Sequence, residues 1–274
     1  MNVLGVAVCL LATAVAVGGS PVEKPPQGRL RIFHGKDAVK GQVPYQVALL
    51  ADSKFFCSGT LISWAAVLTT ANCLDWVRGD VEVRAGIYKL DETGKDVQTT
   101  ITKMEDRVIH PRFDLEYLDN DIAIINNVKI QFVTNLVEWV TLPSYADAGA
   151  DLAGSTVTVT GWGSVSDDDT PNNVLQVAEI RLDNLSECLA DYGNQVIGTK
   201  LCATTGMALS MANTCTGDAG GPAVTFFQRQ YFLVGLVSHG SQQACTEGKP
   251  VVYTRVSSFL DFIAENAKNV KIVD

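Results

Sequence analysis

The sequence predicts an all-β protein that ends in one α-helix. Short runs rich in β-branched and aromatic residues recur along the chain, and turn-forming residues bound each run. The 274 residues include 23 Gly and 9 Pro, and only 19% are charged, a composition typical of a loop-rich β protein. Strands of this length and spacing favour a β-sandwich or β-barrels.

Eight segments have the composition and the boundaries expected of strands. They are residues 45–50, 58–63, 66–70, 81–85, 122–126, 156–161, 231–237 and 251–255. Helical periodicity is clearest near the end, where Phe259, Ile263 and Ala267 fall on one face of a helix over 259–268. We expect Ser257 or Ser258 to cap that helix, and a second short helix near 185–191.

The start of the chain has the pattern of an export signal. An apolar run over 3–17 ends in small residues and is shorter than a membrane span, so residues 1–18 are predicted to be a signal peptide. The Pro-rich, basic segment that follows, 19–31, is predicted to be an exposed propeptide. We therefore expect a zymogen that is secreted to the extracellular space and does not cross a membrane.

Cysteine usage agrees with export. Of the seven cysteines, Cys9 lies in the signal and six remain, which predicts three disulfides. Six cysteines allow about 15 pairings, and spacing alone does not choose among them.

Charge and composition argue against several other classes. The formal charge of −9 repels phosphate backbones, so no nucleic-acid partner is expected. The three histidines, His34, His110 and His239, lack the close partners of a metal site, and we expect no metal and no cofactor. His110 is expected in a surface loop, and the acidic residues Asp91, Glu92 and Asp96 are expected to be solvated.

Seven short motifs occur in a specific order between residue 32 and the end of the chain. They are IFHG at 32–35, CSGTLI at 57–62, LTTANC at 68–73, DNDIA at 119–123, GWG at 161–163, TGDAGGP at 216–222 and VYTRV at 252–256. On these motifs, nearly the whole exported chain resembles the trypsin/chymotrypsin family of serine proteases. It is most similar to the chymotrypsin/collagenase-like branch of insects and crustaceans.

The resemblance implies two packed antiparallel six-stranded β-barrels and a C-terminal helix. The trypsin-like domain would cover 32–274, with barrels over about 32–140 and 141–256 and the helix over about 257–268. The resemblance also implies three disulfides, which are Cys57–Cys73, Cys188–Cys202 and Cys215–Cys245.

The same resemblance locates a catalytic centre that has lost two of its three side chains. Peptide hydrolysis needs a nucleophile, a base that takes its proton, a carboxylate that orients the base, and donors for the oxyanion. The family's base position holds Asn72, and its nucleophile position holds Ala219; only the orienting acid, Asp121, is kept. An amide is not a usable base and a methyl group cannot attack a carbonyl.

Several supporting positions of the family are retained. The oxyanion donors would be the backbone N–H groups of Gly217 and Ala219, which need no particular side chain. Cleavage after Arg31 would free the amino group of Ile32 to pair with Asp218, although the following residues depart from the usual Val-Gly-Gly.

The residues expected around the specificity pocket are altered. Asn213 replaces the acid of trypsins, Gly240 stays small, and Val251 narrows the pocket where many members have Gly. His239 replaces the usual Trp in the edge that pairs with an extended peptide, 238–240. Asn184 begins the only N-glycosylation sequon, a possible modification site.

These observations predict a secreted serine protease homologue, a monomer that acts by binding a protein partner rather than by cutting. The partner would be a protease, a zymogen, an inhibitor or a host protein, with the chain serving as cofactor, decoy or regulator. Two independent losses in a chain that keeps its leader favour a native origin over engineered substitution. The alternative is an active or weakly active secreted endopeptidase of chymotrypsin/elastase-like specificity.

Overall fold

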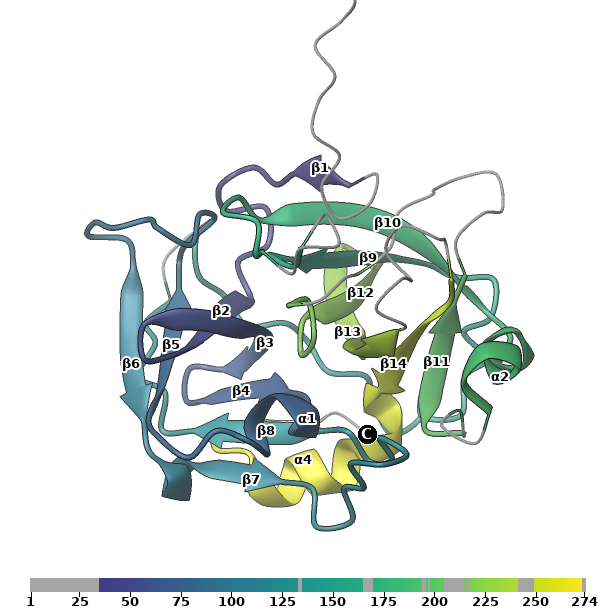
Figure 1. Ribbon diagram of the computed structural model, residues 1–274. Helices are drawn as coiled ribbons and strands as arrows, with labels where there is room; N and C mark the ends of the chain where they lie inside the picture. The colour runs from purple at the N-terminus through teal and green to yellow at the C-terminus, as the bar shows by residue number, and fades with distance from the viewer. Residues whose placement is uncertain are drawn as a thin grey trace, which may run out of the picture.

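Two curved antiparallel sheets lie side by side and make up most of the molecule (Figure 1). The computed structural model describes residues 35–132, 135–164, 170–193, 196, 198–204, 214, 217–240 and 249–272. The predicted signal peptide and propeptide, 1–31, lie outside the described residues.

The first sheet is formed by seven strands in the order β6-β5-β2-β3-β4-β8-β7. The strands are β2 (Gln46–Ala51), β3 (Lys54–Ser63), β4 (Ala66–Thr69), β5 (Val81–Ala85), β6 (Gln98–Thr102), β7 (Arg107–Ile109) and β8 (Ala123–Asn126). The sheet curls, and in the described part of the chain β6 and β7 do not pair, so it forms a half-barrel.

The second sheet closes on itself. Its order is β1-β10-β11-β14-β13-β12-β9, and an additional pairing of β9 with β10 completes a six-stranded barrel. The strands are β1 (Lys36–Asp37), β9 (Thr156–Gly161), β10 (Gln176–Asp183), β11 (Lys200–Ala203), β12 (Pro222–Phe227), β13 (Gln230–Gly240) and β14 (Val251–Arg255). The predicted all-β, trypsin-like fold class is therefore confirmed.

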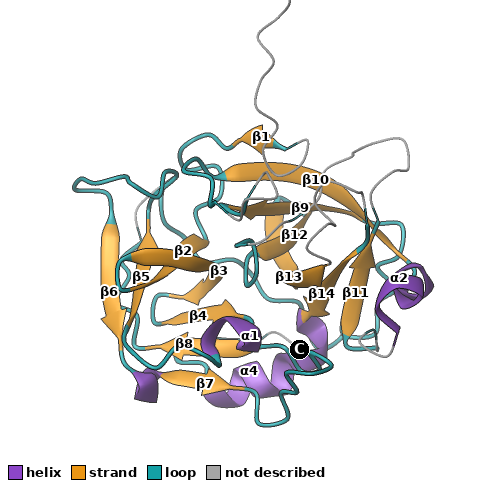
Figure 2. Ribbon diagram, in the orientation of Figure 1, coloured by secondary structure: helices purple, strands orange, loops and turns teal. Residues whose placement is uncertain are grey.

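The helices are few and short (Figure 2). In the described part of the chain they are α1 (Ala71–Leu74), α2 (Leu185–Tyr192) and α4 (Leu260–Asn266), with 3₁₀ turns at Met104–Asp106 and Val256–Phe259. None of the helices in the described ranges is long and apolar enough to cross a bilayer.

The C-terminal helix docks under the first sheet by its apolar face. Leu260, Phe262 and Ile263 are buried, and the side chain of Asn126 in β8 donates to the Asn266 carbonyl and accepts from the Lys268 N–H. The predicted cap was wrong: Ser257 and Ser258 lie inside the 3₁₀ turn. The Ser257 hydroxyl bonds the Ala148 carbonyl instead of a helix N–H.

Sequence reasoning missed the strands whose exposed face is polar. β6 reads QTTIT and is half exposed at the edge of its sheet, and β10 reads QVAEIRLD with alternating buried and exposed residues. β2 and β4, which it identified, are almost wholly buried and apolar, whereas the equally buried β11 was missed because its four residues, KLCA, are too short a run to indicate a strand.

The two described disulfides connect neighbouring elements. Cys57–Cys73 joins β3 to α1, and Cys188–Cys202 joins α2 to β11, as the resemblance implies. Cys215 and Cys245, the third expected pair, lie outside the described residues.

Gly220 permits a close approach between the turn that carries Ala219 and the first sheet. Its φ is +77°, and a Cβ there would lie 2.1 Å from Thr69 Oγ1 and 2.3 Å from the Ser58 carbonyl. Its N–H donates to the Val237 carbonyl at 2.9 Å. The turn that carries Ala219 is therefore held against β3, β4 and β13 because residue 220 has no side chain.

We predict that Gly220→Ala lowers the free energy of unfolding by about 3 kcal/mol or more, since it adds both a backbone clash and a left-handed alanine. Urea unfolding followed by tryptophan fluorescence measures this loss. Gly149→Ala is the matched control, because a Cβ at Gly149 meets no atom within 4 Å. If Gly220→Ala and Gly149→Ala unfold with equal free energies, the turn around Gly220 can shift enough to accept a methyl group.

Candidate active site

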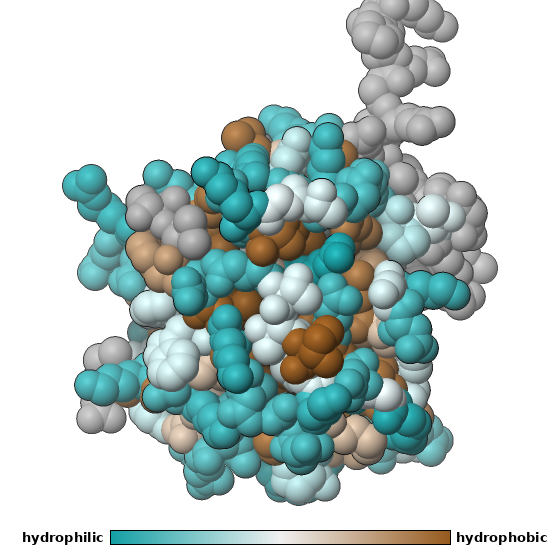
Figure 3. Space-filling model, turned by 90° about the vertical axis from the view of Figure 1, so that its left-hand side faces the viewer, coloured by the Kyte–Doolittle hydropathy of each residue, from teal (hydrophilic) through white to brown (hydrophobic). Residues whose placement is uncertain are grey.

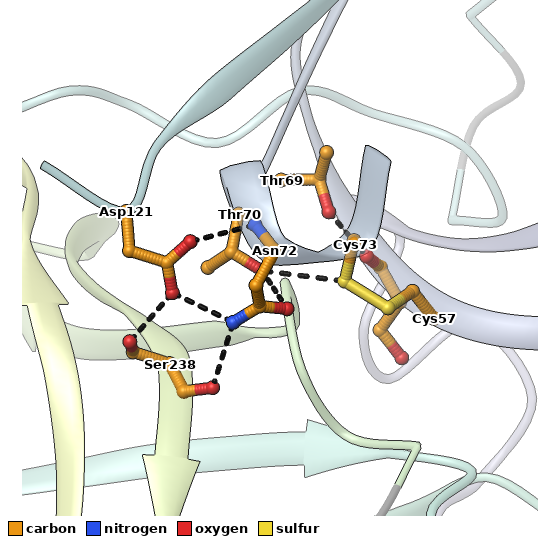
Figure 4. Close-up of a disulfide and its surroundings, with 8 residues drawn as sticks. Cys57, Thr69, Thr70, Asn72, Cys73, Asp121 and Ser238 are labelled. Carbon is orange, nitrogen blue, oxygen red and sulfur yellow. Dashed lines mark hydrogen bonds between the residues drawn. A yellow bond between two sulfur atoms is a disulfide. The ribbon is translucent and has the colours of Figure 1, made fainter. Parts of the chain in front are cut away.

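The side chain of Asn72 occupies the position expected of the catalytic base, and it is engaged on both of its polar atoms. β4 leads through Thr70 into the single turn of α1, which carries Asn72. The amide Nδ2 donates to Asp121 Oδ2 at 2.7 Å and to the Ser238 carbonyl at 3.2 Å, as Figure 4 shows. Oδ1 faces the Thr70 hydroxyl at 3.4 Å.

Asp121 is fully buried and accepts three hydrogen bonds on its carboxylate. Oδ1 accepts from the Asn72 N–H at 2.8 Å, and Oδ2 accepts from Asn72 Nδ2 and from Ser238 Oγ at 2.6 Å. Burial raises the pKa of this carboxyl, whereas the Lys200 charge and these donors oppose the rise. Asp121, which is expected to orient a catalytic base, here orients the side-chain amide of Asn72.

The position of the nucleophile lies next to this cluster. The Ala219 carbonyl accepts from the Ser58 N–H at 2.9 Å, and the following residue, Gly220, bonds Val237, the neighbour of Ser238. The structure therefore brings positions 72, 121 and 219 to the junction of the two sheets. Only a methyl group is present at position 219, and it has no lone pair with which to attack.

The backbone expected to accept an oxyanion lies in the turn that carries Gly217 and Ala219. Gly217 has a φ of +95°, which suits glycine, and Ala219 follows two residues later. In the described part of the chain, neither residue's N–H donates a hydrogen bond. Two free N–H groups on one turn are what an anion-accepting nest requires.

Asp218 is buried beside two glycines. Its Oδ1 accepts from the Gly163 N–H at 2.8 Å. A Cβ on Gly161 would lie 1.9 Å from Oδ1 and one on Gly163 would lie 2.5 Å from the carboxyl carbon, so both positions require glycine. The expected partner of Asp218, Ile32, and the preceding Arg31 lie outside the described residues.

The expected specificity pocket is only partly described. Gly240 in β13 pairs with Val251 in β14. The Val251 side chain is 1% exposed and packs in the core of the second barrel. Asn213 lies outside the described residues.

His239, which the sequence presents as isolated, belongs to the same cluster. Its Nδ1 lies 3.0 Å from Ser238 Oγ, and its ring meets that of Tyr192 edge-on with centroids 5.5 Å apart. Burial, followed by the nearby Lys200 charge, lowers the pKa of His239 from its usual 6.5 to about 4.

Lys200 is a second residue of this region that sequence reasoning missed. It lies in β11, is 1% exposed, and donates from Nζ to the Leu118 carbonyl at 2.5 Å. Burial lowers the pKa of its ammonium, while the charges of Asp121 and Asp119 raise it. The only sequence signal for a buried lysine here was its place in the short run KLCA, where a lysine is also expected at the exposed end of a strand.

Two surface predictions were wrong in part. His110 is buried against the rings of Phe259 and Phe262, because the C-terminal helix covers it. The Glu92 side chain is only 14% exposed and bonds the Lys40 ammonium at 2.6 Å, so it is not simply solvated.

The remaining polar candidates are divided between the surface and the undescribed segments. Asn184 is exposed, and its side chain makes no capping bond at the start of α2. His34 lies outside the described residues. Within the described ranges no group of three His, Cys, Asp or Glu side chains is arranged to hold a metal ion.

Positions 72, 121 and 219 lie where the half-barrel meets the barrel. This combination of fold and site is that of the chymotrypsin-type serine proteases. A family model described as Trypsin matches residues 32–263. The chain belongs to the trypsin family of serine proteases.

Several named proteins are similar to this chain. "Serine protease 1" of Drosophila melanogaster is 33% identical and covers 86% of this chain and 85% of its own length. "Brachyurin" of Leptuca pugilator is 34% identical, with coverage of 85% and 96%. "Chymotrypsin" of Phaedon cochleariae is 30% identical, with coverage of 98% and 99%.

Among solved structures, one titled HL collagenase is similar in fold. It is 28% identical, covers 87% of this chain and 99% of its own, and has a TM-score of 0.74.

We predict that His239 makes the protein less stable as the pH falls from about 6.5 to 4. The unfolded state takes up this proton near pH 6.5 and the folded state only near 4, so the free energy of unfolding decreases through that window. In His239→Phe the decrease should be smaller by about 2 to 3 kcal/mol. Urea unfolding at several pH values measures it.

The comparison of the two profiles isolates His239. His110, Asp121 and Lys200, whose pKa values are also shifted, are present in both proteins, as are Asp119 and Tyr192. If the free energy of unfolding falls equally with pH in the two proteins, His239 titrates at its ordinary pKa in the folded state.

Proposed function

We propose that this chain is a secreted, non-catalytic serine protease homologue that acts by binding a protein partner. The observation that carries the proposal is the engagement of Asn72 with Asp121, beside an alanine at position 219. The partner is a protease, a zymogen, an inhibitor or a host protein, and the chain modulates proteolysis as cofactor, decoy or regulator.

The chemistry at the junction of the sheets supports the absence of turnover. Loss of the nucleophile in a serine protease lowers turnover roughly 10⁶-fold. Asn72 cannot replace the base, since an amide nitrogen carries no available lone pair near neutral pH. Thr214, the described hydroxyl nearest in sequence, is buried and faces the Tyr253 hydroxyl at 3.2 Å.

The preserved scaffold supports a role in binding. The disulfides Cys57–Cys73 and Cys188–Cys202, the tight turn at Gly220 and the free backbone N–H groups of Gly217 and Ala219 do not depend on the side chains at positions 72 and 219. A peptide or loop can be held by such backbone donors without being cut. The described disulfides also accord with an extracellular location.

The face drawn in Figure 3, on the β6 side, offers little for a broad apolar contact. It is mostly hydrophilic, with hydrophobic residues in small separate spots. Contiguous apolar area is what marks a hydrophobic docking site. We propose that the partner binds at the junction of the two sheets, around positions 72, 121 and 219.

A second candidate function is hydrolysis itself. It is favoured by the relatives, which are named as a serine protease, a chymotrypsin and a brachyurin. An active or weakly active endopeptidase would need a nucleophile and a base other than the residues at 219 and 72. The following experiment separates the two candidates.

We predict that the processed protein does not react with a fluorophosphonate probe and does not cleave a casein substrate, because no serine is present at position 219. The double variant Asn72→His plus Ala219→Ser should react with the probe and hydrolyse casein. In-gel fluorescence and release of soluble peptide measure the two results.

The single variant Ala219→Ser serves as the control, since it has a hydroxyl but no base. It should react at least about 100-fold more slowly than the double variant. Labelling of the unmodified protein at an ordinary enzymatic rate would establish the endopeptidase and end the binding proposal.

We also predict that the immobilised protein captures one protein from the secretion in which it occurs naturally, and that Ala219→Trp abolishes the capture by filling the cleft. Trp64→Ala, on an exposed residue of the β3–β4 turn, should leave the capture unchanged. Thermal melting verifies that both variants fold. If both variants still capture the protein, binding at the junction of the two sheets is contradicted.

A further inference from the structure

A cavity of about 600 Å³ lies between the loop that follows β7 and the C-terminal helix α4, two elements that lie side by side in Figure 1. The rings of Phe259 and Phe262 pack edge-on against His110 and form an apolar part of its wall. Positions 72, 121 and 219 do not line it, so the cavity is separate from the candidate active site. Cavities of this size hold small molecules.

His110 has a ring nitrogen without a partner that faces this cavity. The residue is only 7% exposed, and burial, followed by the Arg112 charge, lowers its pKa, so the ring is neutral at neutral pH. Nδ1 accepts from the Arg112 N–H at 3.3 Å, which leaves the proton on Nε2. In the described part of the chain Nε2 makes no hydrogen bond and is not fully enclosed, so it opens onto the cavity that His110 lines. A buried residue with a free donor requires an acceptor, which a ligand can supply.

Three charged side chains that line the same cavity also have no partner. Arg112 is exposed on the loop after β7, and Asp261 and Glu265 are exposed on α4, one helical turn apart. Among the described residues, none of these three side chains forms a hydrogen bond or an ion pair, so the guanidinium does not reach either carboxylate. Like charges four residues apart on a helix repel each other, and the two carboxylates therefore favour a cation beside them.

The polar groups of the cavity are therefore of two kinds. The loop after β7 provides donors, which are the Arg112 guanidinium and His110 Nε2–H, and these suit an anion. The helix α4 provides the carboxylates of Asp261 and Glu265, which suit a cation. A ligand that matches both kinds has a negative end and a positive end, with an apolar part between them.

We propose that this cavity binds a free di- or tripeptide of apolar residues, held by both of its charged ends. The terminal carboxylate accepts from the Arg112 guanidinium and from His110 Nε2. The terminal ammonium donates to Asp261 and Glu265, and the apolar side chains pack against the aromatic wall. Hydrolysis of peptide bonds is the class of reaction that supplies such a ligand, because each cleavage creates one new carboxylate and one new ammonium. The site goes beyond the proposed function and does not depend on it.

Other ligands match the cavity less well. A sulfated or phosphorylated polymer is repelled by the two carboxylates of α4, and a polycation is repelled by Arg112. An uncharged apolar molecule leaves His110 Nε2 unpaired in a drier site, which costs more than a missing contact. A single amino acid holds both of its charges on one carbon, whereas the guanidinium and the carboxylates of the cavity are too far apart to pair.

The dipeptide Leu-Leu and two of its derivatives test the site on the unmodified protein. Isothermal titration calorimetry should give Leu-Leu a dissociation constant below about 1 mM. N-acetyl-Leu-Leu lacks the ammonium and Leu-Leu amide lacks the carboxylate, so each should bind about tenfold more weakly. Absence of Leu-Leu binding at about 5 mM, or derivatives that bind as tightly as Leu-Leu, would overturn the proposal.

Variants of exposed residues assign the two ends of the peptide. In Arg112→Gln the preference for Leu-Leu over its amide should disappear, while the preference over the N-acetyl derivative stays. The double variant Asp261→Asn plus Glu265→Gln should show the reverse. Arg181→Gln is the matched control, since Arg181 is exposed in β10 and does not line the cavity, and it should keep both preferences. Preferences that survive in both test variants would place the peptide elsewhere and overturn the site.

A spectroscopic measurement on the unmodified protein makes the test independent of variant folding. The ¹⁵N resonance of His110 Nε2 should shift as Leu-Leu binds, and Leu-Leu that binds without this shift overturns the site. The fluorophosphonate and casein assays report on the proposed function separately. Hydrolytic activity would refute the proposed function and leave this site standing, whereas failure of Leu-Leu to bind would refute this site alone.

Discussion

The hydrogen bonds that converge on Asp121 are the constraint on which the rest of the cleft depends. Its buried carboxylate accepts from α1 through Asn72 and from β13 through Ser238, and its carbonyl accepts from Thr254 in β14. One residue thereby joins the half-barrel to the barrel. An uncompensated buried charge would be costly, and these donors, together with the Lys200 charge, oppose the rise in the pKa of Asp121 that burial causes.

This arrangement shows how residues 72 and 219 fit the junction between the two sheets. The Asn72 amide donates to Asp121 and to the Ser238 carbonyl. The Ala219 carbonyl accepts from Ser58, and the two described disulfides join neighbouring elements on either side. The proposal that the protein binds a partner without cutting it is compatible with this ordered junction.

The same carboxylate is connected to His239. The Ser238 hydroxyl donates to Asp121 Oδ2, so its oxygen is left to accept from His239 Nδ1. Burial, followed by the Lys200 charge, disfavours the protonated imidazole. The histidine is therefore linked through Ser238 to the junction of the two sheets.

The sequence alone determined the fold class, eight of the strand segments and the identities at positions 72, 121 and 219, because ordered motifs and short β-rich runs are local patterns. It did not reveal β6 or β10, whose exposed faces are polar, nor the short buried strand β11, nor the burial of His110 under the C-terminal helix. Only the tertiary structure linked His239 through Ser238 to Asp121 and placed the Lys200 ammonium against the Leu118 carbonyl, because these contacts join segments far apart in the chain and no periodicity records them.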